Sequence, residues 1–174
     1  LKCLNWKKIF KSKKDILNGS QKINLYELSE VFSKTLPSNS VFLCDSGFID
    51  VILPTNIRFR KKQICIHPVS QGSMGFALPA IIGAYGTGKK NIVSVIGDGS
   101  IMMNLQELQT IKYYKIPAKI FIINNKMYGI IRRRQKELFR GRTIGTDDTN
   151  GVGNPDFRKI SKAFDIKYKL IKTK

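Results

Sequence analysis

The sequence predicts an α/β protein with a three-layer α/β/α, doubly wound architecture around a mainly parallel sheet. Two observations carry this prediction. Short apolar runs bounded by polar or turn-forming residues recur along the chain, as is typical of buried parallel strands. Segments with apolar residues at helical spacing lie between them, as the crossovers of a parallel sheet require. At 174 residues and 42% hydrophobic, the chain suits one domain with a packed core.

The beginning of the chain is rich in lysine, and residues 1–20 are predicted to form a basic linker or a helix leading into the domain. Residues 21–174 then form the domain. An amphipathic helix on a membrane surface is the alternative for the basic stretch. The first helix of the domain is predicted to start at Asn24, because Asn caps helix N-termini and Glu27 stands at the third helical position. Pro37 is expected to help end it.

Four segments are predicted to be strands of the sheet, namely residues 40–44, 64–66, 91–96 and 118–123. Each is a short apolar run followed by a polar or turn-forming residue. The last two flank a helical segment and so predict a βαβ unit, whose crossover is expected to be right-handed. An alternation of apolar residues with lysine at 166–170 has the pattern of a further strand.

Helices are predicted between and after these strands. Residues 74–85 are apolar nearly all round, which is typical of a buried helix. Between the third and fourth strands, apolar residues recur near helical spacing at Met103, Leu108 and Ile111. Residues 130–139 are predicted to form another helix. Asn154 is predicted to cap a last helix with Pro155 at its first position. The inner stripe of that helix comprises Phe157, Ile160 and Phe164.

Polar side chains follow the two strands of the βαβ unit at the points where these strands end. Asp98 follows one strand within a Gly-Asp-Gly-Ser motif, and Asn124 and Asn125 follow the other. Carboxylate and carboxamide oxygens are ligands that Mg²⁺ prefers when it also binds phosphate, and open α/β sheets bind ligands at this edge. Backbone N–H groups of Gly99 and Ser100, at the start of the following helix, are expected to contact phosphate. A structural acid at a helix N-terminus is the alternative for Asp98.

Three blocks of the sequence resemble a known family. Gly-Asp-Gly at 97–99 with Asn-Asn at 124–125 is similar to the thiamine diphosphate signature. Residues 72–83, Gly-Ser-Met-Gly-Phe-Ala-Leu-Pro-Ala-Ile-Ile-Gly, resemble a second block of acetolactate-synthase-like enzymes. Residues 139–160 resemble thiamine diphosphate proteins of bacterial surface-polysaccharide gene clusters. The similarity covers residues 24–168 and is to the C-terminal, diphosphate-binding domain of thiamine diphosphate-dependent enzymes.

The resemblance implies a thiamine diphosphate-binding fold with thiamine diphosphate and Mg²⁺ as cofactors. Its implied metal ligands are the side chains of Asp98 and Asn125 and the main-chain oxygen of Met127. Met74 would hold the cofactor in its bent conformation, although a buried methionine is by itself usually core filler. The expected cofactor-binding residues are Gly47, Phe48, Gly72, Ser73, Met74, Gly97, Gly99, Ser100, Tyr128 and Gly129. For Gly47 and Phe48, an ordinary strand-to-helix turn is the alternative.

The resemblance further implies part of a 2-oxoacid decarboxylase or carboligase, a lyase or transferase acting on a small 2-oxo acid. In these enzymes an activating glutamate comes from a pyrimidine-binding domain, and no glutamate of this chain matches its motif. We therefore expect no catalytic residue in this chain, no activity alone, and a pyrimidine-binding domain or subunit as partner. The complete enzyme is expected to be a homo-oligomer, dimer or tetramer. The domain is expected to be incomplete at its C-terminus.

The sequence also departs from the acetolactate synthases it resembles. Lys-Met-Tyr-Gly follows the Asn-Asn pair at residues 126–129, where those enzymes have Glu-Glu-Gln-Gly, so acetolactate is not predicted as the product. Residues 140–153 are rich in Gly, Thr, Asp and Asn, as in a mobile active-site loop. His67, the one histidine, is either an active-site residue or a surface or capping residue.

The net charge of +19 raises the alternative of a basic nucleic-acid-binding module. The basic residues are scattered, however, and the one tight cluster is Arg132-Arg133-Arg134, without a nucleic-acid-binding motif. A catalytically dead remnant of the fold is a further alternative. No apolar run approaches the ~20 residues that span a bilayer, so no membrane partner is predicted. The three cysteines lack metal-ligand spacing, which favours reduced thiols and the cytoplasm.

Overall fold

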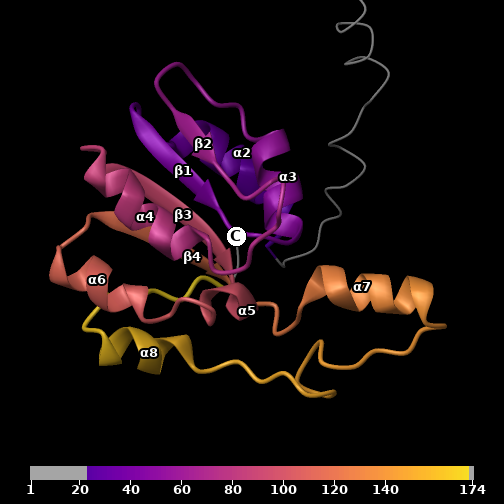
Figure 1. Cartoon of the computed structure of the whole chain (residues 1–174). Coiled ribbons are helices and arrows are strands. Elements are labelled where there is room, and N and C mark those ends of the chain that lie inside the picture. Colours follow the sequence, from indigo (N-terminus) through magenta and orange to yellow (C-terminus); the bar gives the residue numbers. More distant parts are fainter. Residues whose placement is uncertain (1–22, 173–174) are drawn as a thin grey trace, which may run out of the picture.

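The computed structural model describes residues 23–172, in which a four-stranded sheet is covered by helices on both faces (Figure 1). The predicted linker at 1–20 lies outside the described residues. The elements are α2 (Leu25–Thr35), β1 (Ser40–Cys44), α3 (Phe48–Asn56), β2 (Ile64–Ile66), α4 (Ala77–Gly86), β3 (Asn91–Gly97), α5 (Asp98–Ile101), α6 (Glu107–Tyr113), β4 (Ala118–Ile123), α7 (Gly129–Leu138) and α8 (Phe157–Ala163).

The sheet has the order β2-β1-β3-β4, and all of its neighbouring strands are parallel. All four strands predicted before residue 130 are present. The chain moves from β1 outward to β2, returns past β1 to β3, and continues to β4, which is the doubly wound pattern. The carboxyl ends of β1, β3 and β4 consequently lie at one edge of the sheet, where ligands of such folds bind.

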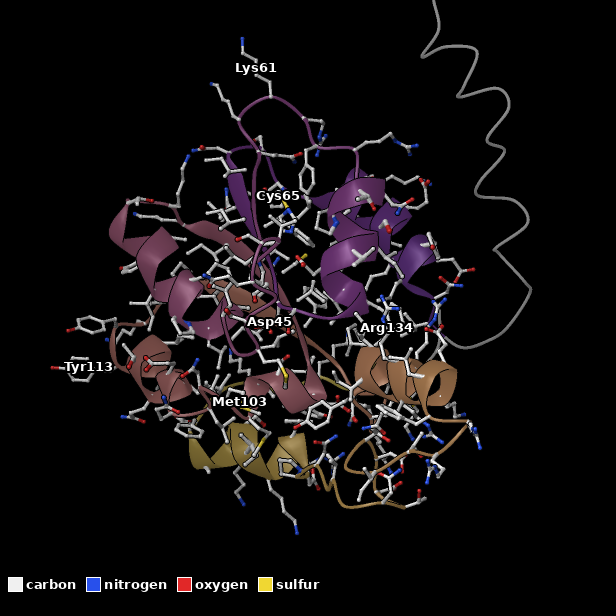
Figure 2. The ribbon with its side chains drawn as sticks, turned by 45° about the vertical axis from the view of Figure 1, so that its right-hand side comes forward. Asp45, Lys61, Cys65, Met103, Tyr113 and Arg134 are labelled. Carbon is white, nitrogen blue, oxygen red and sulfur yellow. The ribbon has the colours of Figure 1, made fainter. Side chains whose placement is uncertain are left out.

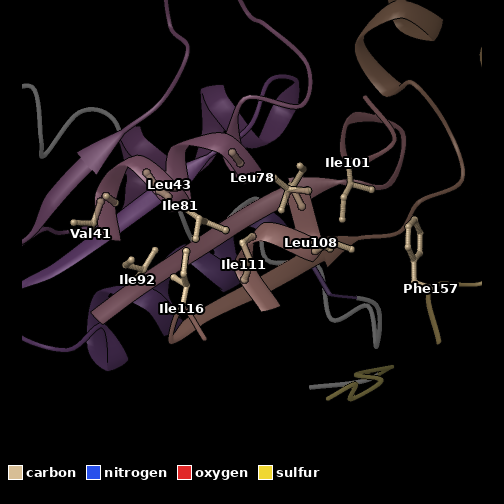
Figure 3. Close-up of a cluster of buried hydrophobic side chains, with 13 residues drawn as sticks. Val41, Leu43, Leu78, Ile81, Ile92, Ile101, Leu108, Ile111, Ile116 and Phe157 are labelled. Carbon is tan, nitrogen blue, oxygen red and sulfur yellow. The ribbon is translucent and has the colours of Figure 1, made fainter. Parts of the chain in front are cut away.

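Alternation of side chains along the strands builds one apolar layer on each face of the sheet. Val41 and Leu43 face a cluster formed with α4, α5, α6 and α8, part of which Figure 3 shows. Phe42 and Cys44 face the other cluster, formed with α2 and α3. Within that second cluster Phe32 packs edge-on against Phe42, with ring centroids 5.1 Å apart. This double coverage explains why β1 is buried at every position.

The predicted N-terminal caps of the first and last described helices had different outcomes. The side chain of Asn24 accepts a hydrogen bond from the Tyr26 amide, so the predicted cap of α2 is confirmed. The predicted cap of α8 is wrong, because Asp156 accepts the bond from the Arg158 amide and the helix starts two residues later. The predicted inner stripe of α8 is confirmed, since Phe157 is buried and its companions pack against the same core.

Three other predictions of secondary structure need correction. Residues 166–170 form no strand, because the Ile166 amide bonds to the Ser161 carbonyl and the tail continues without regular structure. The segment after β3 is broken into α5 and α6, and Met103 lies half-exposed in the turn between them. Helix α4 starts at Ala77 and is not buried all round, since its Pro79 and Gly83 are exposed. Within residues 23–172, no helix has the length and apolarity needed to cross a membrane.

Candidate cofactor site

The residues predicted to bind the metal follow two neighbouring strands. Gly97, the last residue of β3, pairs in parallel register with Ile123, the last residue of β4. Asp98 and Asn124 are therefore neighbours across the end of the sheet, with Asn125 one residue further. The prediction that these two strand ends lie side by side is confirmed.

Asp98 is buried at the end of β3, with 2% of its surface exposed. Its Oδ1 accepts a hydrogen bond from the Gly99 amide at 2.9 Å, and its Oδ2 accepts one from the Lys126 amide at 2.6 Å. Burial raises the pKa of the Asp98 carboxyl, while the amides of Lys126 and Gly99 act in the opposite direction. Among the described residues, no Lys, Arg or His side chain forms an ion pair with it. Asp98 is thus a buried carboxylate held by neutral donors, a setting that a cation would stabilise.

The other two predicted ligands lie in the turn after β4. Asn125 is exposed, and its Oδ1 accepts a hydrogen bond from the Met127 amide at 3.1 Å. A carboxamide oxygen has two lone pairs, so Oδ1 of Asn125 could bind a cation with the lone pair that this hydrogen bond leaves free. Lys126 between them has a positive φ of 57°, which turns the chain back toward β3. In residues 23–172, no three His, Cys, Asp or Glu side chains are grouped to hold a metal, so a site here depends on amide, main-chain and cofactor oxygens.

Two pairs of predicted cofactor residues are in close contact above these strand ends. A Cβ atom on Gly99 would lie 2.8 Å from Cδ1 and 2.9 Å from Cζ of Tyr128, so the Tyr128 ring covers the Gly99 backbone. A Cβ on Gly129 would lie 3.4 Å from Cδ2 of Phe48 and 3.8 Å from Nδ2 of Asn125. The starts of α3 and α7 therefore meet beside the turn that carries Asn125.

The turn after β1 joins the same group. Gly47 has a φ of 101°, in the region that favours glycine, and directly precedes α3. The hydroxyl of Ser46 lies 3.5 Å from that of Ser100, which is itself buried in the single helical turn α5. Gly97 lies under this contact, since a Cβ on it would be 3.9 Å from the Ser100 side chain.

Residues 72–76 form a non-helical segment before α4, with a turn at 74–76, in place of the predicted helical start. Gly72 and Gly75 both have positive φ, of 60° and 80°. Ser73 is exposed, and Met74 is 36% exposed, so this methionine is not core filler. The turn packs on the region of α5, because a Cβ on Gly75 would lie 2.7 Å from Cβ of Met103.

A buried aspartate that was not among the predicted site residues fixes the position of this segment. Asp45 is fully buried at the end of β1, near the centre of Figure 2. Its Oδ1 accepts hydrogen bonds from the amides of Ser46 at 2.9 Å and Gly75 at 3.0 Å, and its Oδ2 accepts one from Ala77 at 2.8 Å. The carboxylate thereby ties the segment that carries Met74 to the end of β1. The position of Asp45 directly after a buried strand is the sequence feature that could have identified it.

The segment after α7, predicted to be a mobile loop, is held by a network of hydrogen bonds. Arg132 of α7 forms an ion pair with Asp147, which is 2% exposed. The hydroxyl of Thr149 bonds to Asp147 at 2.6 Å, and this bond and Arg132 hold the pKa of the Asp147 carboxyl low. The Tyr128 amide donates to the Thr146 carbonyl at 2.8 Å, so the segment lies against the predicted metal-binding turn.

Two further polar residues have specific partners. Asn154 donates from Nδ2 to Oδ2 of Asp98 at 3.0 Å, so it lies in the candidate site and was missed there because Asn-Pro fits the pattern of a helix start. His67, left open in the sequence analysis, bonds through Nδ1 to Oδ1 of Asp50 on α3 at 2.6 Å. It therefore links the segment after β2 to α3.

The strand order, the glycine-rich turns and the buried aspartate at the end of β3 define a cofactor-binding α/β domain. The family described as "Thiamine pyrophosphate enzyme, C-terminal TPP binding domain" matches residues 45–174. The chain therefore belongs to this family of thiamine diphosphate-binding domains. Membership implies thiamine diphosphate, together with a divalent metal that is usually Mg²⁺, as the cofactors.

Curated relatives and a solved structure agree with this assignment. The chain is 36% identical over 138 residues to the acetolactate synthase large subunit of Pyropia yezoensis, covering 79% of this chain and 23% of the relative. It is 34% identical over 140 residues to the acetolactate synthase isozyme 2 large subunit of Escherichia coli, covering 80% and 25%. The thiamine diphosphate-dependent 4-hydroxybenzoylformate decarboxylase of Rhodococcus jostii superposes with a TM-score of 0.77 at 25% identity, over 90% of this chain and 29% of that one. The chain thus spans about a quarter of the length of these proteins.

Proposed function

We propose that this domain holds the diphosphate and the Mg²⁺ of thiamine diphosphate within a 2-oxoacid decarboxylase or carboligase. In this proposal Asp98, Asn125 and the main-chain oxygen of Met127 bind the metal. The diphosphate is bound near Gly99, Ser100, Tyr128 and Gly129. The observation that carries the proposal is the buried Asp98 carboxylate, which lies beside Asn124 and Asn125 and has only N–H donors as partners among the described residues.

The donor set fits a hard divalent cation. Mg²⁺ binds carboxylate and carbonyl oxygens in octahedral geometry and usually completes its shell with phosphate oxygens and water. Asp98 supplies a full negative charge, whereas Asn125 and Met127 supply neutral oxygens. The cation compensates the buried charge of Asp98, and the diphosphate brings the remaining negative charge. This division explains how a site without a cluster of acidic side chains can hold Mg²⁺.

The remaining residues shape the space around the cofactor. Asp45 fixes the segment that carries Met74, and in this proposal the 36% exposed Met74 side chain contacts the cofactor. The Tyr128 ring lies against the backbone of Gly99, and the Phe48 ring lies beside Gly129. When bound, thiamine diphosphate supplies the carbanion stabilisation that decarboxylation of a 2-oxo acid requires.

The proposal includes a second domain. The chain spans about a quarter of its relatives' length, and none of its glutamates matches the motif of the activating residue. We assign that residue to a pyrimidine-binding domain or subunit of the same enzyme, in a homo-oligomer. The substrate class is a small 2-oxo acid, and the chain alone is expected to be inactive.

The positive charge of the chain supports nucleic-acid binding less well than the site supports cofactor binding. The arginine cluster on α7 is largely paired within the protein, because Arg132 contacts Asp147 and the other two contact Glu137 at 2.7 and 3.7 Å. Figure 2 shows Arg134 on this helix. Paired guanidinium groups are less available for phosphate contacts along a nucleic acid.

Calorimetric titration of thiamine diphosphate into the protein tests the proposal. We expect binding in Mg²⁺, no binding in EDTA, and loss of binding in Asp98→Ala. Asp165→Ala is the matched control, because Asp165 is exposed and pairs with Lys112 on α6, away from the ends of β3 and β4. Binding that persists in EDTA, or in Asp98→Ala, would contradict the metal assignment.

A further inference from the structure

The side chain of Asn154 contacts the carboxylate proposed to bind the metal. Its Nδ2 lies 3.0 Å from Oδ2 of Asp98, and the two residues are 56 positions apart. Asn154 does not serve as the cap of α8, because Asp156 takes that role. Its carboxamide is therefore used for a long-range contact within the candidate site.

Within residues 23–172, hydrogen-bond donors to the Asp98 side chain come from three segments of the chain. The Gly99 amide belongs to the same helical turn and binds Oδ1, while the Lys126 amide comes from the turn after β4 and binds Oδ2. Asn154 is the one side-chain donor to this carboxylate among the described residues. A buried carboxylate without donors is costly, and each donor restricts the orientation of its plane. Asn154 is therefore one of the groups that restrict the orientation of the Asp98 carboxylate, together with the Lys126 and Gly99 amides.

Asn154 is itself fixed from both sides. Two residues later, Asp156 caps α8, and Phe157 anchors that helix in the core. Upstream, the Val152 amide bonds to the Asp147 carbonyl at 2.9 Å, and Asp147 is tied to Arg132. Because the backbone on both sides of Asn154 is already held, the contact with Asp98 costs little additional backbone entropy.

We infer that Asn154 is a positioning residue for the metal: it orients the Asp98 carboxylate, and the affinity of the site for a divalent cation depends on it. This inference rests on the proposed function. Removing a residue that orients a metal ligand by hydrogen bonding typically lowers the affinity for the metal by about 10–100-fold. Asn154 thereby makes the segment after α7 part of the metal site, although it contributes no ligand.

The test compares Asn154→Ala and Asn154→Leu with the wild type. The leucine variant keeps the approximate volume of the side chain but donates no hydrogen bond. Asn91→Ala is the matched control, because Asn91 is exposed at the opposite end of β3 and donates to the Ser38 carbonyl. Binding of Mn²⁺ in the presence of thiamine diphosphate is followed by electron paramagnetic resonance. We expect the dissociation constant of Mn²⁺ to rise about 10–100-fold in both Asn154 variants and to stay unchanged in Asn91→Ala.

A measurement without cofactor checks the contact itself. In a double-mutant cycle of Asp98→Ala and Asn154→Ala, the shifts of the urea midpoint are expected to be non-additive. Additive shifts overturn the inference, and so does wild-type affinity for Mn²⁺ in the Asn154 variants. If the wild type binds no Mn²⁺ with thiamine diphosphate, it is the proposed function that fails, whereas the cycle still decides whether Asn154 and Asp98 are coupled.

Discussion

The substitution Gly75→Ala tests the packing of the turn before α4. Gly75 has a φ of 80°, and a Cβ there would lie 2.7 Å from Cβ of Met103, 2.9 Å from Nδ2 of Asn104 and 3.3 Å from the Ser100 carbonyl oxygen. The left-handed conformation costs an L-residue about 1–2 kcal/mol, and overpacking costs about 1–3 kcal/mol more. We therefore expect Gly75→Ala to lower the free energy of unfolding by about 2–5 kcal/mol.

Gly72→Ala separates these two contributions. Gly72 lies three residues earlier in the same non-helical segment with a φ of 60°, but no atom lies within 4 Å of the position that a Cβ would take there. Its substitution should cost only the conformational part, about 1–2 kcal/mol. The measurement is urea unfolding monitored by circular dichroism. The free energies of both variants are compared with one common value for their dependence on urea concentration. Equal destabilisation of the two variants would show that the turn does not pack against α5 as described.

Further predictions concern three other parts of the domain. Gly99→Ala should destabilise the protein by about 1–3 kcal/mol because its Cβ meets the Tyr128 ring, and Tyr128→Ala should relieve most of this loss in the double variant, as measured by thermal unfolding. Asp156→Ala should cost about 0.5–2 kcal/mol in urea unfolding, since it removes the cap that binds the Arg158 amide, and an unchanged midpoint would contradict this role. Burial raises the pKa of the Cys65 thiol to about 11 from an ordinary value of 9.0, so at pH 8 iodoacetamide should modify it about 100-fold more slowly in the folded protein than in urea. Because the folded state disfavours this thiolate, the protein should also lose stability as the pH rises from about 9 to 11.

The sheet could be predicted from the sequence because its signals are local. Each strand is a short apolar run that ends at a polar or turn-forming residue, and the parallel order follows from the helical segments between the runs. The same local logic was wrong at 166–170, where apolar residues alternate with lysine but the Ile166 amide is already bonded to the Ser161 carbonyl. A periodic pattern specifies one apolar face and does not specify the partner of that face.

The candidate site was predictable where residues follow strand ends and not where distant segments meet. Asp98 and Asn125 were identified because parallel neighbouring strands bring their ends together, which the register of β3 and β4 confirms. Their roles as metal ligands stay predictions. Asn154 matched a helix cap in sequence, and only its contact with a residue 56 positions away reveals its different use. Asp45 was similarly missed, because its partners Gly75 and Ala77 lie 30 and 32 residues later in the chain.

The central claim is that the ends of β3 and β4 together bind a divalent metal and thiamine diphosphate. Paramagnetic broadening of backbone amide signals by Mn²⁺ in the presence of thiamine diphosphate tests it most directly, because it locates even a weakly bound ion. We predict selective broadening at Gly99, Ser100 and residues 125–127, and its loss in Asp98→Ala. Broadening elsewhere on the protein, or broadening at the same residues that persists in Asp98→Ala, would contradict the claim.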